Sequence, residues 1–205
     1  GIAGLAPWLG DLLWYQALPG IGTTLVLTQI ALVGTGIVAL LTFPLISRLF
    51  VDRFCQVPGH GLLIIGRSVP EYLLAYILLQ LWGPSMLPAA VALVIHNGAI
   101  IGHLIGRQSS TLKLRPDVVT GFNCYTYEVV PRLYRSFLAF LLYRWEIIMR
   151  ETAILGILGI TTLGFYVDSA IQELRFDRAI VLIFITALLN IGVDSLARTI
   201  RGQLR

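Results

Sequence analysis

Charged residues are scarce in this chain of 205 residues. Asp, Glu, Lys and Arg make up only 13% of it, against about 25% in an ordinary soluble domain. Hydrophobic residues make up 57%, and the mean hydropathy is +0.82. This composition argues against a soluble protein and predicts an all-α, polytopic membrane protein. We find no internal repeat, so residues 1–205 are expected to form one transmembrane domain.

Residues that commonly carry catalysis or bind metals are also few. The chain has two cysteines, Cys55 and Cys124, in connections expected to face the reducing cytoplasm, so we expect neither a disulfide nor a zinc site. His96 and His103 lie seven residues apart without the carboxylate of an H-E-x-x-H motif, which favours helix packing. No G-x-x-x-x-G-K-[ST] motif occurs. We therefore expect no catalytic residue, no metal and no cofactor in this chain.

Five apolar runs approach the roughly 20 residues that a helix needs to cross a bilayer. They cover residues 21–50, 62–82, 86–106, 133–160 and 179–196. We predict about five transmembrane helices from them. The first and fourth runs exceed one crossing, so each is expected to include tilt, an interfacial turn or a break.

The basic residues indicate the orientation of these spans. With five crossings, eleven of the fifteen Lys and Arg residues flank one side, at the first and third connections and at the C-terminal end. Because cytoplasmic connections are enriched in Lys and Arg, we predict that the N-terminus is outside and the C-terminus is cytoplasmic. The net charge of +4 follows from this bias and gives no reason to expect a nucleic-acid partner.

Trp8, Trp14 and Tyr15 are spaced among leucines in the N-terminal segment, residues 1–20. Aromatic rings favour the headgroup level, so this segment is predicted to lie along the outer interface before the first span enters at residues 20–24. An irregular terminus is an equally supported alternative. The first residues lack the basic start of a signal peptide, so no cleavable signal is expected, and further residues can precede Gly1.

The third connection, residues 107–132, is the longest polar stretch and is predicted to be cytoplasmic. Pro116 and Gly121 interrupt it, and Asp117 is positioned to cap a short helix that follows. A connection of this length usually has a function, and docking of another protein is the first candidate. A segment lying on lipid headgroups is the alternative. The aromatic anchors expected for docking are Phe122, Tyr125 and Tyr127.

Residues 143–151, YRWEIIMRE, place four ionisable side chains between two apolar runs. Charges are costly in hydrocarbon, so they are expected to face protein, a cavity or a transport pathway. On a helix, Glu146 and Arg150 lie four apart on one face, whereas Arg144 and Glu151 lie seven apart on nearly the opposite face. We predict that one pair faces the pathway or a partner subunit and the other contacts neighbouring spans. Internal pairing of all four, which only fixes helix packing, stays open.

Two further charges have an acidic or basic neighbour four residues away. Glu71 follows Pro70, where a kink is expected, and it is predicted to pair with Arg67. Asp194 is predicted to pair with Arg198.

Five collinear segments resemble the inner-membrane permease subunit of binding-protein-dependent ABC importers, and within it the phosphonate permease branch. They are RSVPE at 67–71, ALVIHNG at 92–98, YRWEI at 143–147, LGILG at 155–159 with Gly164, and Asp194-Ser195 with Arg198 and Arg201. The chain departs from the family pattern at Thr161 and Thr162, which replace glycines. The cytoplasmic signature by which these permeases contact their ATPase survives only as Val130-Pro131 and Gly121, in a stretch several residues short.

The resemblance implies a MetI-like ABC permease fold in the cell inner (plasma) membrane. It implies a second permease subunit, identical or paralogous, two cytoplasmic ABC ATPase subunits that bind ATP and Mg, and an extracytoplasmic binding protein. The cargo implied is a phosphonate-, phosphite- or phosphate-like oxyanion. The candidate pathway or gate residues are Arg144, Glu146, Arg150, Glu151, Gly156, Gly159 and Gly164. The candidate ATPase-coupling residues are Lys113, Arg115, Asp117, Gly121, Phe122, Tyr125, Tyr127 and Pro131.

Three alternatives remain open from the residues alone. A stand-alone secondary carrier would use Glu146 or Glu151 as a protonation switch, although such carriers usually show paired repeats. A permease-like subunit could serve a different small solute. An intramembrane enzyme would need a nucleophile and base or a metal set, for which only scattered histidines and serines are present.

Overall fold

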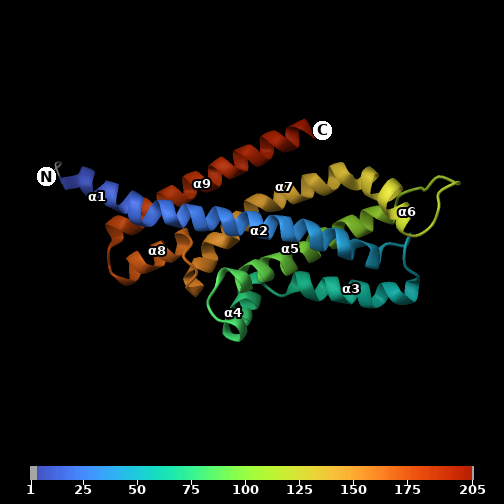
Figure 1. The fold of residues 1–205 in the computed structure, drawn as a ribbon, viewed down its shortest axis with the longest axis horizontal. Coiled ribbons are helices and arrows are strands. Elements are labelled where there is room, and N and C mark those ends of the chain that lie inside the picture. The colour runs from blue at the N-terminus through green and yellow to red at the C-terminus, as the bar shows by residue number, and fades with distance from the viewer. Residues whose placement is uncertain (1–3, 205) are drawn as a thin grey trace.

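The computed structural model describes residues 4–204, and this part of the chain contains helices and connections but no strand. A continuous helical segment opens the fold: α1 (Leu5–Leu12), a π-helical turn η2 (Leu13–Ala17), α2 (Leu18–Thr42) and a 3-10 turn η3 (Phe43–Ile46). The remaining elements are α3 (Arg53–Ser68), α4 (Glu71–Trp82), α5 (Met86–Ser109), α6 (Phe122–Cys124), η4 (Tyr125–Val129), α7 (Val130–Ile154), η5 (Leu155–Leu158), α8 (Leu163–Gln172) and α9 (Phe176–Gln203). They form an elongated bundle (Figure 1).

Three helical segments are long and apolar enough to cross a membrane: Leu5–Ile46, Met86–Ser109 and Phe176–Gln203. Two bent pairs also qualify, α3 with α4 at 89° and α7 with α8 at 41°, which gives three to five candidate spans. The predicted bend at Pro70 is confirmed. The N-terminal segment predicted to lie along the interface is helical from Leu5 and continues without interruption into the first candidate span, Leu5–Ile46.

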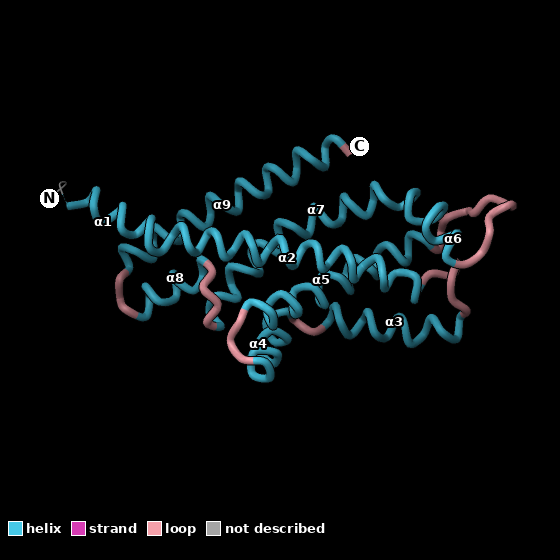
Figure 2. Tube along the Cα trace, in the orientation of Figure 1, coloured by secondary structure: helices cyan, strands magenta, loops and turns pink. Residues whose placement is uncertain are grey.

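Helices α2 and α5 form the centre of the bundle and lie side by side along most of their length (Figure 2). Gly98, Gly102 and Gly106 recur every four residues on α5, and a Cβ on any of them would collide with α2 or the turn after it, at Val38, Thr42 or Ile46. Small residues at this spacing let two helix backbones approach closely, which is how helices associate in lipid. The tight pairing gives the site residues on α5 a rigid support.

Helix α9 lies at the edge of the bundle. It packs on α7 and α8, but only 17% of its most apolar window is buried within the chain. In Figure 1 its C-terminal half diverges from α7. Large apolar side chains such as Ile180, Phe184 and Leu188 are exposed along it. An apolar surface of this kind suits contact with lipid tails or with another membrane subunit.

Candidate functional site

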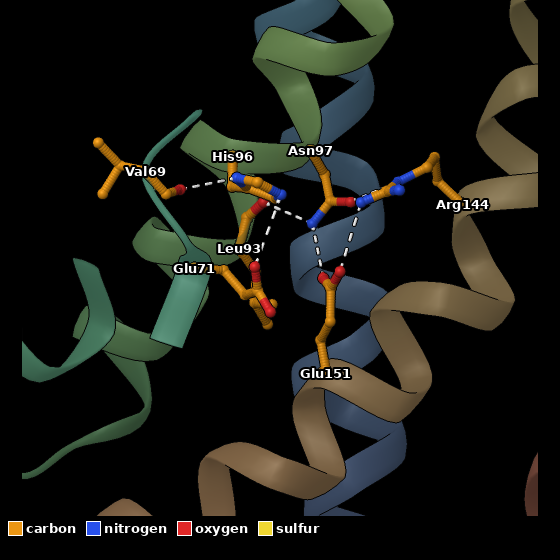
Figure 3. Close-up of polar contacts among 7 residues, drawn as sticks. All are labelled: Val69, Glu71, Leu93, His96, Asn97, Arg144 and Glu151. Atoms are coloured by element: carbon orange, nitrogen blue, oxygen red, sulfur yellow. Dashed lines mark hydrogen bonds and ion pairs between the residues drawn. The ribbon is translucent and has the colours of Figure 1, made fainter. Parts of the chain in front are cut away.

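A buried polar network connects α7 to α5 at the level of the charged segment (Figure 3). Arg144 and Glu151 of α7 form an ion pair at 3.3 Å, and their side chains are only 14% and 11% exposed. Asn97 of α5 lies against both: its Oδ1 accepts a hydrogen bond from Arg144 Nε at 2.6 Å, and its Nδ2 donates to Glu151 Oε2 at 2.9 Å. Asn97 is fully buried, and its Nδ2 also donates to Leu93 O at 3.0 Å. All three side chains are therefore fixed.

The network continues to the sharp corner between α3 and α4. His96, next to Asn97 on α5, has its Nδ1 2.9 Å from Val69 O and its Nε2 3.5 Å from Glu71 Oε2. A carbonyl oxygen can only accept, so Nδ1 must donate to Val69. Nε2 then faces a carboxylate, and the contact is favourable when a proton lies between them, with His96 as the cation.

The predicted pairing of Glu71 with Arg67 is wrong, because the 89° bend ends α3 before Glu71 and removes the helical spacing that the prediction needed. The interpretation of the two histidines as packing residues is also incomplete. His103 does pack, with its ring 5.7 Å from the ring of His60, whereas His96 belongs to the polar network.

Glu71, His96 and Glu151 offer ligand atoms that lie within 4.8 Å of one another, close enough to hold a metal ion. Carboxylate and imidazole are common ligands of divalent cations. Arg144, which is paired with Glu151, would repel an added cation.

The second predicted pair, Glu146 and Arg150, is also formed, at 2.9 Å along one face of α7. It differs from the network in exposure, since the Arg150 side chain is 55% exposed. The prediction that the segment divides into two pairs is confirmed. Arg144 and Glu151 contact a neighbouring span, whereas Arg150 is largely exposed and Glu146, at 24%, is partly buried beside it.

The three glycines predicted to line the pathway lie in the turn from α7 through η5 to α8. Gly159 has φ +92°, a left-handed conformation that side chains rarely adopt. A Cβ on Gly164 would collide with the backbone oxygen of Ala153, and one on Gly156 with the backbone nitrogen of Phe165. Glycine is therefore required at these positions by the turn itself. The 41° bend between α7 and α8 lies at these glycines, where the sequence predicted a bend.

The predicted coupling residues lie at the end of the bundle farthest from α1 (Figure 1). Phe122 and Tyr127 are 79% and 78% exposed. The other exposed members of the set are Lys113, Arg115, Asp117, Gly121 and Pro131. Asp117 does not cap a helix as predicted, because the chain stays irregular until α6 begins after Gly121, whose φ is +87°.

Tyr125 differs from its two aromatic neighbours and is not an exposed anchor. Its ring stacks on Phe43 with centroids 5.4 Å apart, and its hydroxyl donates to Leu40 O at 2.9 Å. Pro44, four residues beyond Leu40, has no N–H to give that carbonyl. Tyr125 therefore completes the end of α2 and fixes the coupling segment to the central helix pair.

No family model matches this chain. It is similar to the phosphate-import permease protein PhnE of Mycolicibacterium smegmatis, with 26% identity over 155 residues, 73% of this chain and 29% of that protein. It is also similar to the phosphite transport system permease protein PtxC of Stutzerimonas stutzeri, with 24% identity over 146 residues, 68% of this chain and 53% of that protein. The chain thus spans about a third to a half of the length of these two relatives.

The same fold occurs in solved transporter structures. A chain of an amino acid ABC transporter with histidines superimposes with a TM-score of 0.75 at 16% identity, covering 99% of this chain and 98% of that one. A chain of the inward-facing MetNI methionine ABC transporter gives 0.73 at 13% identity, covering 91% and 97%. The chain thus has the fold of these two ABC transporter chains and is similar in sequence to two transport permeases.

Sequence reasoning found the charges on α7 but missed Asn97 and His96, which connect them to α5 and to the α3–α4 corner. An available signal was the consecutive His96-Asn97 in an apolar helix, because polar side chains inside a span are expensive and usually paired.

Proposed function

We propose that this permease forms half of the translocation pathway of an ABC importer for a phosphonate-, phosphite- or phosphate-like oxyanion. The observation that carries the proposal is sequence similarity over 155 and 146 residues to permeases named for phosphate and phosphite. The fold supports the importer part of the proposal, and the choice of cargo rests on the two relatives.

A second permease subunit, identical or paralogous, would complete the pathway. Arg150 supports this assembly, because its side chain is 55% exposed on α7, which together with α8 is a candidate membrane span. Lipid tails are a costly environment for a guanidinium. The Glu146–Arg150 pair would therefore face the second subunit or the aqueous pathway between the two.

Two ABC ATPases would dock at the coupling end of the bundle, which the basic residues assign to the cytoplasm. Phe122 and Tyr127 supply exposed aromatic anchors there, next to a cavity of about 360 Å³ between the connection and η4. Exposed aromatic side chains beside a hollow are typical of a protein-docking surface. The opposite end, where α1 and the α8–α9 turn lie together in Figure 1, would receive the extracytoplasmic binding protein.

The test is co-expression of the permease with the ATPase encoded by an adjacent gene, followed by purification through a tag on the permease. We expect the ATPase to copurify, and we expect Phe122→Ser combined with Tyr127→Ser to abolish this. Phe176→Ser is the matched control, because Phe176 is 56% exposed at the start of α9, away from the coupling segment. Solute uptake by the permease alone, in liposomes without ATP, would instead support a secondary carrier.

A further inference from the structure

A cavity of about 750 Å³ lies between α5, α7 and α9, on the side of α7 where α9 diverges. Four arginines line it, Arg135 and Arg144 from α7 and Arg198 and Arg201 from α9. No Asp or Glu is among the described residues of its lining. We call this cavity the arginine groove. Its positive charge is concentrated against walls that are otherwise mostly apolar, where charges are poorly screened.

The carboxylates that pair with these arginines lie outside the lining. Arg198 is paired with Asp194 one turn back on α9, and Arg144 with Glu151 two turns farther along α7. Arg201 stacks on the ring of Tyr143, with Cζ 5.5 Å from its centroid, and its buried Nε has no hydrogen-bond partner within the described chain. Arg201 thus lines the groove with a guanidinium that forms no ion pair with any described residue.

The arginines are spaced along the groove rather than gathered at one point. Arg135 and Arg144 are nine residues apart on α7, which corresponds to about 13.5 Å along the helix axis. Arg198 and Arg201 are three apart on α9 and so share a face. Between them the wall is apolar, with Phe140, Leu104 and Leu204. A ligand with a small anionic head and an apolar part would fit both kinds of surface.

We propose that the arginine groove binds a tetrahedral phosphorus oxyanion. The planar guanidinium fork matches two oxygens of such a group, and the Tyr143 hydroxyl can supply a further donor from the same wall. A free phosphonate and the headgroup of an anionic phospholipid share this chemistry. The choice of a phosphonate as the free anion to be tested rests on the proposed function. The proposal of an oxyanion site in the groove rests on the arginines that line it.

The first experiment uses the purified full chain in a maltoside detergent without added lipid. Binding of methylphosphonate is measured by calorimetry at low salt for the unchanged protein and for Arg201→Gln, Arg198→Gln and Arg53→Gln. The control residue Arg53 begins α3 and is exposed outside the groove, so its variant has the same charge change. Loss of one charged hydrogen-bond donor should weaken binding by about 10-fold to 100-fold for Arg201→Gln, and less for the solvent-facing Arg198→Gln.

The second experiment replaces the free anion by phosphatidylglycerol and measures retained lipid by native mass spectrometry. Weakening of either ligand by Arg201→Gln or Arg198→Gln, but not by Arg53→Gln, supports the proposal and identifies the source of the oxyanion. Absence of binding for both ligands, or equal weakening by all three variants, overturns it. Neither experiment needs an ATPase, so failure here is distinct from failure of copurification, which tests the importer assignment.

Discussion

Loss of the Arg144–Glu151 ion pair should strongly lower the free energy of unfolding of this protein. Both side chains are largely buried, and Glu151 also accepts a hydrogen bond from Asn97. In Arg144→Gln the carboxylate of Glu151 stays in place but loses its counter-charge. Removing one partner of a buried ion pair destabilises a protein by about 3–5 kcal/mol, since the remaining charge is uncompensated.

We expect the lower end of this range, about 3 kcal/mol, because the Asn97 amide continues to donate to Glu151. For a chain of this size, that loss corresponds to a melting temperature lower by roughly 6–12 °C. In the double variant Arg144→Gln with Glu151→Gln no charge is left unpaired. The double variant should therefore be no less stable than Arg144→Gln alone, which requires a coupling free energy of about 3 kcal/mol between the two positions.

The assay is thermal unfolding of the purified chain in detergent for the two single variants and the double variant. The matched control is the same cycle at Glu146 and Arg150, which lie on the same helix. Because Arg150 is 55% exposed, that cycle should give a coupling below about 1 kcal/mol. If the Arg144 and Glu151 effects are additive, or if both cycles give equal coupling, burial does not strengthen the Arg144–Glu151 ion pair.

Three further predictions concern stability, two of them measured by thermal unfolding and the third by hydrogen exchange. Tyr125→Phe removes only the hydroxyl that caps the end of α2, and should cost about 0.5–1.5 kcal/mol. Gly164→Ala forces a Cβ against backbone and should cost at least about 1–3 kcal/mol, whereas Gly192→Ala, in open space on α9, should be neutral or slightly stabilising. Glu71→Ala leaves His96 Nε2 without its partner and should speed hydrogen exchange in the first turn of α4.

The sequence predicted local and charge-pattern features of the fold well. All five apolar runs contain helix, and the bends fall where Pro70 and the glycines after the charged segment interrupt helical hydrogen bonding. The division of the charged segment into two pairs followed from helix geometry alone. The continuation of α2 into α1 was missed, because the aromatic side chains near the N-terminus suggested an interface, and the helix continues through Pro7 and Pro19.

Contacts between distant segments were not predictable from spacing. Glu71, His96 and Glu151 come from three helices, and only packing of α5 between the α3–α4 corner and α7 brings them together. The role of Tyr125 has the same origin: its partner, Leu40 O, is 85 residues away in the sequence. From the sequence alone, Tyr125 could not be distinguished from an exposed docking residue, because its packing partner on α2 was unknown.

Arg144 belongs to both the buried network and the arginine groove. An oxyanion that reaches its guanidinium would compete with Glu151 for the same donors and weaken the contact between α7 and α5. Arg201 is outside the network, and its stacking on Tyr143 joins α9 to α7 instead. Substitution of Arg144 should therefore change both stability and anion binding, whereas substitution of Arg201 should change binding with a smaller loss of stability, of about 1 kcal/mol. If anion binding at Arg144 weakens the contact between α7 and α5, the groove changes the packing of the central helices when it is occupied. If it does not, the groove only binds the anion.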